Sequence, residues 1–173
     1  MRAWLALALV LPVAAWAQAS NFDAIFDDDS RWEAVQSQLP PYPKPEHYLP
    51  FTVNAVTSFD FFVDAKSVSI GNDGVVRFSL IAKSPSGALN ISFEGIRCTG
   101  RQYRVYAFGR SDNSWSRARN SRWQPLLQNS DNVQRAVLYG SFFCPDGIII
   151  ATPEKGLQAL RNGGLPLARD PSP

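Results

Sequence analysis

The side chains able to carry out nucleophilic or metal chemistry are few in this sequence. It contains one histidine, His47, inside the proline-rich segment Pro40–Pro50. A zinc site usually draws on several His and Cys ligands. A serine or cysteine nucleophile normally needs a basic partner such as histidine. We therefore predict no catalytic residues, no metal site and no cofactor, and we expect His47 to be an exposed loop residue.

Paired carboxylates leave one enzymatic alternative open, because a glycoside hydrolase needs only two of them. Asp60 and Glu94 are the candidates, since both are expected to point off the core face of adjacent strands. The alternative is that they form salt bridges to Arg77 or Arg104. A carbohydrate-active or cell-wall hydrolase is therefore the second interpretation. The acidic run Asp27–Asp29 lacks the glycine and the distal glutamate of a calcium loop.

The best candidate for a contact surface is the segment between residues 110 and 123, where four arginines are interleaved with two tryptophans. Both residue types are enriched at binding hot spots, and arginine binds phosphates and carboxylates in bidentate fashion. The competing interpretation is that both tryptophans pack inward, while the arginines stack over them or neutralise an acidic segment. The predicted partner-binding residues are Arg110, Trp115, Arg117, Arg119, Arg122 and Trp123.

Charge is distributed unevenly along the chain. Residues 20–64 carry eight acids against Arg31 and Lys44, whereas residues 97–123 carry seven arginines against Asp112 alone. Such asymmetry either pairs internally or presents a basic face to an acidic partner. For an exported protein, we expect that partner to be an anionic envelope component or an acidic protein and not a nucleic acid.

Export is predicted by residues 1–19. Arg2 precedes an apolar run from Ala3 to Ala17, and the small residues Ala15, Ala17 and Ala19 form two overlapping cleavage sites. This combination is typical of a secretory signal peptide cleaved near Ala17 or Ala19. The run is shorter than the roughly 20 residues of a membrane span. We expect a soluble periplasmic or secreted protein with no membrane span.

Two cysteines, Cys98 and Cys144, occur in the sequence. An even number of cysteines in an exported chain favours one disulfide. A metal-binding or nucleophilic pair would require further ligands or a nearby base, and neither is evident in the sequence.

The elements that must position these residues follow from periodicity. A capping box at Ser30 and Glu33 predicts a short helix over 31–38. Alternation of apolar and polar residues then predicts strands at 59–63, 76–83, 89–94 and 101–108. We expect one face of the sheet to be buried against a core and the opposite face to point toward solvent. The first is predicted to carry Val76, Phe78, Leu80, Leu89, Ile91 and Phe93, and the second Arg77, Ser79, Asn90, Ser92 and Glu94.

The remainder of the chain is predicted to contain a long loop, two helices and one more strand. The loop covers 109–124, and a helix capped by Asp131 or Asn132 extends to about Phe142. A short buried strand is expected at 147–151, followed by a final helix from Pro153 or Glu154 that ends at Gly163-Gly164.

These elements predict an α+β fold: an antiparallel β-meander of about five or six strands with helices packed on one side and one disulfide. The expected organisation has four parts. They are a signal peptide (1–19), an acidic leader with a short helix and a Pro-rich segment (20–50), the α+β domain (51–164) and a disordered tail (165–173).

Several motifs together resemble a known family. They are Trp32-Glu33 leading to Leu39-Pro40-x-Tyr42-Pro43, the stretch from Ser69 to Arg77, the stretch from Ser86 to Cys98 with its Glu-Gly-Ile-Arg-Cys motif, and Phe142-Phe143-Cys144-Pro145. Over roughly residues 30–150 the chain resembles the cryptic neisserial protein family, small exported bacterial proteins without an assigned activity. The resemblance implies an exported proteobacterial protein and supplies no catalytic residues. We therefore expect an interaction or accessory protein of the bacterial periplasm.

Overall fold

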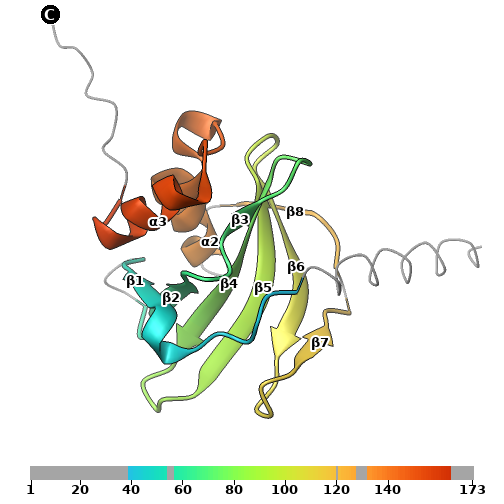
Figure 1. Ribbon diagram of the computed structural model, residues 1–173, viewed down its shortest axis with the longest axis vertical. Helices are drawn as coiled ribbons and strands as arrows, with labels where there is room; N and C mark the ends of the chain where they lie inside the picture. The colour runs from blue at the N-terminus through green and yellow to red at the C-terminus, as the bar shows by residue number, and fades with distance from the viewer. Residues whose placement is uncertain (1–38, 54–56, 120, 128–131, 165–173) are drawn as a thin grey trace, which may run out of the picture.

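The computed structural model describes residues 39–53, 57–119, 121–127 and 132–164. The predicted signal peptide, acidic leader, helix at 31–38 and C-terminal tail lie outside these residues. Within them, the chain forms an antiparallel sheet that carries short helices against one face (Figure 1).

The sheet has eight strands in the described part of the chain. They are β1 (Tyr48–Phe51), β2 (Asp60–Asp64), β3 (Ser69–Ile70), β4 (Val75–Lys83), β5 (Leu89–Arg97), β6 (Gln102–Gly109), β7 (Trp115–Arg117) and β8 (Gln124–Pro125). The order is β1-β2-β4-β5-β6-β7, with β3 paired to β4 and β8 paired to β6. All pairs are antiparallel, so the predicted meander is confirmed.

Tight turns connect the two longest strands to their neighbours. Gly74 has φ 69° and closes the turn before β4, where its N–H donates to the Gly71 carbonyl at 3.0 Å. Gly87, with φ 86°, lies in the β4–β5 connection. Both positions need a left-handed backbone that glycine adopts without steric cost.

The predicted assignment of residues to the two sheet faces is wrong for β5. Phe78 pairs with Glu94, and Leu80 pairs with Ser92, so even-numbered residues of both strands share one face. Ile91 and Phe93 consequently lie on the opposite face from Phe78 and Leu80. Leu89 was expected to be buried, but it is 48% exposed.

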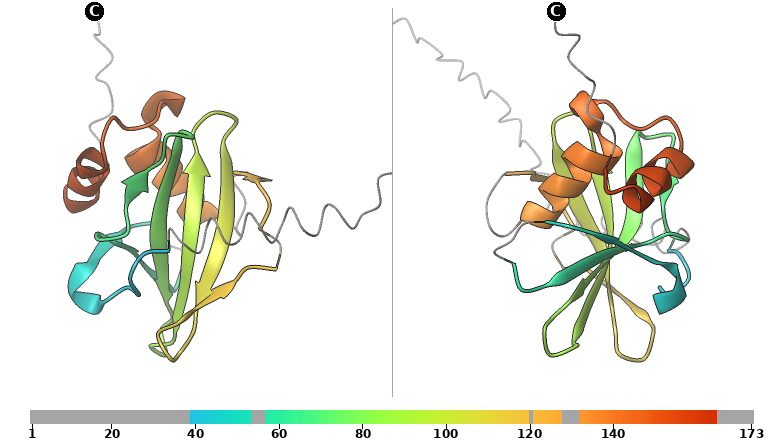
Figure 2. Two further views of the ribbon diagram at one scale, coloured as in Figure 1. Left: turned by 45° about the vertical axis from the view of Figure 1, so that its right-hand side comes forward. Right: turned by 90° about the vertical axis from the view of Figure 1, so that its left-hand side faces the viewer.

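The face that carries Phe78 is covered by the helical part of the chain (Figure 2). This part comprises α2 (Val133–Leu138), the π-helical η2 (Tyr139–Phe143), the short 3-10 turn η3 (Pro145–Gly147) and α3 (Pro153–Arg161). Leu138, Phe143 and Leu160 pack there with the sheet, and the Phe78 and Phe143 rings lie 5.1 Å apart. The predicted helices near 132–142 and 153–162 are confirmed, although they are short.

The opposite face of the sheet has its own, smaller apolar cluster. Phe93, Tyr106 and Ala107 are buried there, and Leu39 and Trp115 pack against them. The proline-rich segment therefore contributes to the fold: after Leu39 it forms a 3-10 turn, η1 (Pro45–His47), and then the edge strand β1. Pro50 is tolerated in β1 because β1 lies at the edge of the sheet.

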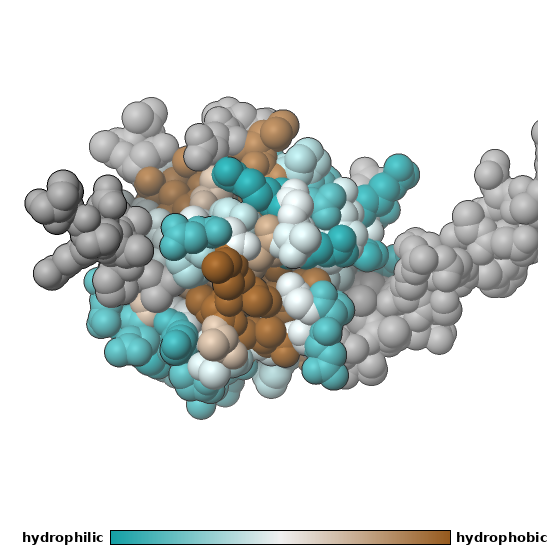
Figure 3. All heavy atoms as spheres, turned by 90° about the horizontal axis from the view of Figure 1, so that it is seen from above, coloured by the Kyte–Doolittle hydropathy of each residue, from teal (hydrophilic) through white to brown (hydrophobic). Residues whose placement is uncertain are grey.

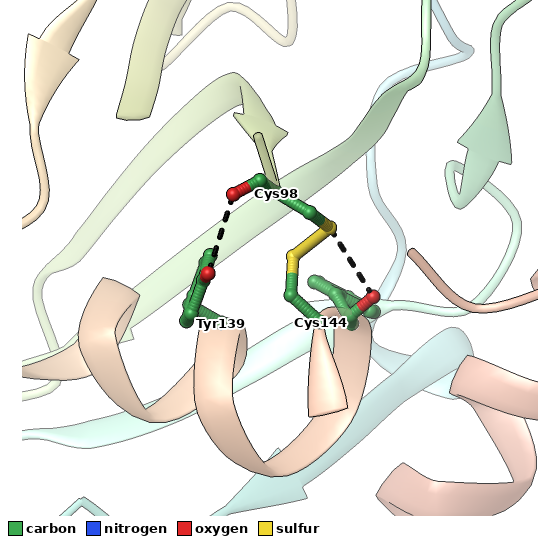
Figure 4. Close-up of a disulfide and its surroundings, with 4 residues drawn as sticks. Cys98, Tyr139 and Cys144 are labelled. Carbon is green, nitrogen blue, oxygen red and sulfur yellow. Dashed lines mark hydrogen bonds between the residues drawn. A yellow bond between two sulfur atoms is a disulfide. The ribbon is translucent and has the colours of Figure 1, made fainter. Parts of the chain in front are cut away.

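The predicted disulfide between Cys98 and Cys144 is confirmed, with Cα atoms 5.5 Å apart (Figure 4). Cys98 follows β5 directly and Cys144 follows η2, so the bridge joins the sheet to the helical part. The Tyr139 hydroxyl donates to the Cys98 carbonyl at 3.2 Å at the same place.

Two predictions for the second half of the chain are wrong. Residues 109–124 are not one long loop, because β7 and the start of β8 pair with β6. Residues 147–151 form no strand: Gly147 ends η3, residues 148–151 are irregular, and Ile148 is 69% exposed. Among the described residues, no helix is long and apolar enough to cross a membrane.

Candidate functional site

The segment from Arg110 to Trp123 follows the length of strand β6. Trp115 pairs with Gly109 at the end of β6, whereas Gln124, the neighbour of Trp123, pairs with Tyr103 near its beginning. The two tryptophans are thus separated by about five residues of strand, on the order of 17 Å. The segment forms an elongated margin of the sheet and not a single compact cluster.

Trp115 packs inward. Its indole Nε1 donates to the Pro40 carbonyl at 3.0 Å, and its ring lies 5.4 Å from Tyr42 and 6.2 Å from Phe93. The Tyr42 hydroxyl in turn donates to the Arg110 carbonyl at 2.8 Å. These contacts fasten the proline-rich segment to the β6–β7 hairpin, and they give Trp115 a structural role.

Trp123 is covered by an arginine from a neighbouring strand. The Arg97 guanidinium carbon lies 4.0 Å from the centre of the Trp123 ring, a cation–π geometry. Arg97 also donates from Nη1 to the Gln102 side chain at 3.3 Å. The stacking that we considered between arginines and tryptophans therefore occurs at Trp123, but its arginine comes from β5.

The four predicted arginines differ in exposure. Arg110, Arg119 and Arg122 are exposed, whereas Arg117 is half-buried in β7. Asp112, the acid of this segment, is held by Ser114, whose N–H and hydroxyl donate to it at 3.0 and 2.6 Å. These hydrogen bonds lower the pKa of Asp112, with a smaller contribution from the charge of Arg110.

Two further arginines lie beside Tyr106, on the face opposite the helices. The guanidinium carbons of Arg77 and Arg104 are 5.7 and 5.3 Å from the centre of its ring. Arg77 is paired with Asp73, and its Nη1 donates to Oδ1 at 3.0 Å. Arg104 donates from Nε to the Ser121 hydroxyl at 2.9 Å. Burial raises the pKa of the Tyr106 hydroxyl, although both arginine charges oppose the shift.

Glu94 forms a buried ion pair on the helix-covered face. Arg135 of α2 donates from Nε to Oε2 at 2.6 Å and from Nη2 to Oε1 at 2.7 Å, and the Ser92 hydroxyl donates to Oε1 at 2.6 Å. Glu94 is fully buried. Burial acts to lower the pKa of Arg135, but the charge and hydrogen bonds of Glu94 more than offset this and raise it. Glu94 therefore pairs with neither Arg77 nor Arg104, the two partners that we had considered.

The two candidate carboxylates do not meet. Asp60 pairs with Lys83 at one end of β4, whereas Glu94 pairs with Phe78, five residues farther along β4 and one strand beyond it. This register separates them by roughly 19 Å, whereas carboxylate pairs of glycoside hydrolases are about 5–9.5 Å apart. Asp60 and Glu94 therefore do not form the hydrolase pair.

His47 is half-buried and not the exposed loop residue that we expected. Its Nδ1 lies 3.8 Å from Oδ1 of Asp64, whose side chain is 2% exposed. Burial raises the pKa of Asp64, while the Lys66 N–H, His47 and Ser67 partly oppose this. Nothing in the sequence indicated this pair, because 16 residues separate its members. Among the described residues, no group of three potential metal ligands occurs.

A hydrophobic patch, ringed by hydrophilic residues, is visible at the end of the molecule seen from above (Figure 3). The segment between η2 and α3, orange in Figure 1, also lies at this end. It contains Ile148, the most exposed of the large apolar residues in the described ranges. We had predicted a buried strand at 147–151, because a short apolar run has the same sequence pattern in a buried strand and in an irregular segment.

Comparison with known proteins agrees with the resemblance seen in the motifs. The sequence model of the CNP1-like family matches residues 27–161. The chain belongs to the CNP1-like family. It is similar to "Cryptic neisserial protein 1" of Neisseria gonorrhoeae (strain ATCC 700825 / FA 1090), with 30% identity over 99 residues, 50% of this chain and 48% of that protein. The chain thus spans about half the length of the curated relative that it matches. No solved structure matches it.

The CNP1-like match covers both cysteines and the whole segment from Arg110 to Trp123. It also includes residues 27–38, which lie outside the described residues, and it ends before the tail at 165–173. The predicted partner-binding residues thus belong to the CNP1-like region of the chain, and their role remains a prediction.

Proposed function

We propose that the chain is exported to the bacterial periplasm, where it acts as an interaction or accessory protein by binding and not by catalysis. Its partner in this proposal is an anionic component of the cell envelope. The contact surface is the β6 margin, which we define as the exposed residues Arg110, Arg119 and Arg122 with the half-buried Arg117.

Export is supported by the N-terminal sequence and by the disulfide. Residues 1–19 have the order of basic, apolar and small residues that is typical of a cleaved signal peptide. Cys98 and Cys144 are bridged, and disulfides persist mainly in oxidising compartments such as the periplasm.

The observation that carries the binding proposal is the exposure of arginines along one margin of the sheet. Trp115 and Trp123 make internal contacts, with the Pro40 carbonyl and the Arg97 guanidinium, and these two contacts do not involve the exposed guanidinium groups. Asp112 is held by Ser114. Exposed arginines of one sign attract an anionic surface, and this attraction is screened beyond about 8 Å at physiological ionic strength.

The test compares the double variant Arg119→Ala/Arg122→Ala with the unchanged protein on a heparin column. We expect elution at clearly lower salt, with a melting temperature within about 3 °C, because exposed charges contribute at most about 1 kcal/mol. Lys155→Ala/Arg161→Ala is the matched control, because it removes the same charge from exposed positions of α3.

Equal loss of retention in the control variant would mean that only net charge matters, and would end the proposal for the β6 margin. Unchanged retention of the Arg119/Arg122 variant would also refute binding at the β6 margin. Retention that is lost together with several degrees of melting temperature would indicate that these arginines support the fold.

A further inference from the structure

An aromatic groove lies away from the β6 margin, between the β1–β2 strands and the helical part. Its volume is about 520 Å³, within the range of roughly 300–1,000 Å³ that is usual for ligand pockets. We define the aromatic groove by the five phenylalanines that line it: Phe51, Phe59, Phe61, Phe62 and Phe142. The Phe51 ring lies 5.9 Å from those of Phe61 and Phe142, and Phe59 is 39% exposed. An apolar occupant is favoured, because it would remove these rings from water.

A smaller hollow of about 270 Å³ lies beside the sheet and α2, and its lining is more polar. We call it the amide pocket, after Asn90 of β5 and Gln134 of α2. Neither amide side chain makes a hydrogen bond to another residue in the described ranges, so each can donate to and accept from an occupant. Phe108 also lines the amide pocket and is 47% exposed.

The aromatic groove and the amide pocket share a floor and a wall. Phe61 of the groove pairs with Ala82 of the pocket across β2 and β4, so the two linings meet at neighbouring positions of the sheet. Gln134, Val137 and Ser141 are spaced by three and four residues and therefore lie on one side of the helical segment. The first lines the pocket, and the other two line the groove. We call the two hollows together the trough.

The trough crosses the strands. Its floor uses the last residues of β4, the first of β5 and the last of β6, and these ends of the sheet extend past α2 in the right-hand view of Figure 2. Phe51 in β1 and Phe108 in β6 are four strand spacings apart in the sheet order. At about 4.8 Å for each spacing, the trough is roughly 19 Å long. It therefore suits an elongated ligand.

The charged groups of the trough lining are compensated by neighbours. Arg135 lines the amide pocket, and its guanidinium group is paired with the buried Glu94. Asp60 lines the aromatic groove, and Lys83 is its partner in the β2–β4 register. A charged ligand group would find no free opposite charge among the described lining residues, and its transfer out of water would be unfavourable.

We propose that the trough binds an uncharged amphiphile, whose acyl chain lies in the aromatic groove against Phe51, Phe61 and Phe142 and whose hydroxyl- or amide-bearing head group lies beside Asn90 and Gln134. The trough is thus a binding site for a neutral lipid. It is separate from the β6 margin and does not rest on anion binding there.

The test is isothermal titration calorimetry of the mature, disulfide-bonded protein with lauroyl glycerol below its micellar concentration. We expect one ligand per chain and a negative heat-capacity change, which marks the burial of apolar surface. Laurate and dodecylamine carry chains of the same length with an anionic or a cationic head group. Each should bind about tenfold more weakly, because its charge finds no free partner.

Two tryptophan variants locate the site. Asn90→Trp places a large side chain in the trough, opposite Ala82, and should abolish binding. Leu89→Trp is the matched control, because Leu89 is the neighbouring residue, is 48% exposed and points to the opposite face. It should leave binding unchanged. Neither variant should alter retention on heparin, which keeps this test distinct from that of the β6 margin.

Two milder variants separate the ends of the trough. Gln134→Ala should weaken binding of lauroyl glycerol about fivefold through the loss of one hydrogen bond, and should leave dodecylamine unaffected. Phe59→Ser should weaken all three ligands by a similar factor, because it removes apolar surface that contacts the chain. Both positions are partly or fully exposed, so the melting temperature should stay within about 3 °C.

Four results would overturn the proposal. Absence of binding heat with lauroyl glycerol would show that the trough takes no acyl chain. Equal loss of binding in Asn90→Trp and Leu89→Trp would place the site elsewhere. Laurate or dodecylamine binding as tightly as lauroyl glycerol would refute the uncharged head group. One ligand for two chains would assign the site to an interface between copies.

Discussion

Replacing Arg135 by methionine would leave Glu94 buried beneath α2 without its cationic partner. The arginine supplies two of the three hydrogen bonds that this carboxylate receives from described side chains, and the third comes from Ser92. Methionine retains most of the apolar stem but removes the guanidinium group, whose carbon lies 4.6 Å from the centre of the Tyr103 ring. The change therefore removes charge and hydrogen bonds more than packing.

The expected loss of stability is large. Removing one partner of a buried ion pair typically costs about 3–5 kcal/mol, because the remaining charge stays buried. The Arg135 side chain is 14% exposed, so water reaches part of it. We therefore expect the lower end, about 3 kcal/mol, and a melting temperature lower by roughly 10 °C.

The assay is urea unfolding of the mature, disulfide-bonded protein, followed by tryptophan fluorescence. A second variant, Glu94→Gln/Arg135→Met, removes both charges and should recover a substantial part of the loss. Arg161→Met is the matched control at an exposed position of α3, and it should stay within about 0.5 kcal/mol of the unchanged protein.

The reasoning would be refuted if Arg135→Met lowered the free energy of unfolding by less than about 0.5 kcal/mol, because a carboxylate that stays buried without its cationic partner destabilises the fold by more than that. It would also fail if the double variant were no more stable than the single one. That result would mean that the loss came from the packing of residue 135 and not from an unpaired charge.

Two further predictions concern the disulfide and the Asp64 carboxyl. Cys98→Ala/Cys144→Ala, which opens a sequence separation of 46 residues, should lower the free energy of unfolding by about 4 kcal/mol in urea; a loss under 1 kcal/mol would contradict the prediction. Burial raises the pKa of Asp64 above its ordinary value of 3.8, so the folded protein holds this proton more tightly than the unfolded chain. The stability that this group contributes is therefore fully present below that value and is lost as pH rises through the raised pKa. Asp64→Asn should remove this part of the pH dependence in urea unfolding between pH 3 and 7, and an unchanged profile would contradict the assignment.

Strand positions were predictable from the sequence, but their relative phase was not. Alternation in 76–83 and in 89–94 identified β4 and β5 correctly. Lys83 pairs with Leu89 across the turn, so odd positions face odd positions. A turn one residue shorter or longer would place the odd-numbered residues of β5 on the same face as the even-numbered residues of β4. Alternation within each strand therefore could not assign Glu94 to its face.

The candidate site shows a similar division. The segment from Arg110 to Trp123 was identified from composition, and the inward packing of Trp115 was one of two interpretations left open. The choice between them depended on Pro40, 75 residues away in sequence, whose carbonyl accepts the indole hydrogen bond. The partner of Glu94 was mispredicted for the same reason, since Arg135 is 41 residues distant.

By itself, the sequence determined the local properties of this protein: the antiparallel strands, the short helices, the cysteine pair and the family. Period, turn residues and motifs are properties of neighbouring residues, so they are readable without coordinates. Only the tertiary structure decided which face Glu94 occupies, that His47 lies beside Asp64 and that five phenylalanines line one groove. These contacts join distant segments, and their existence depends on strand register and on how the helical part packs across the sheet.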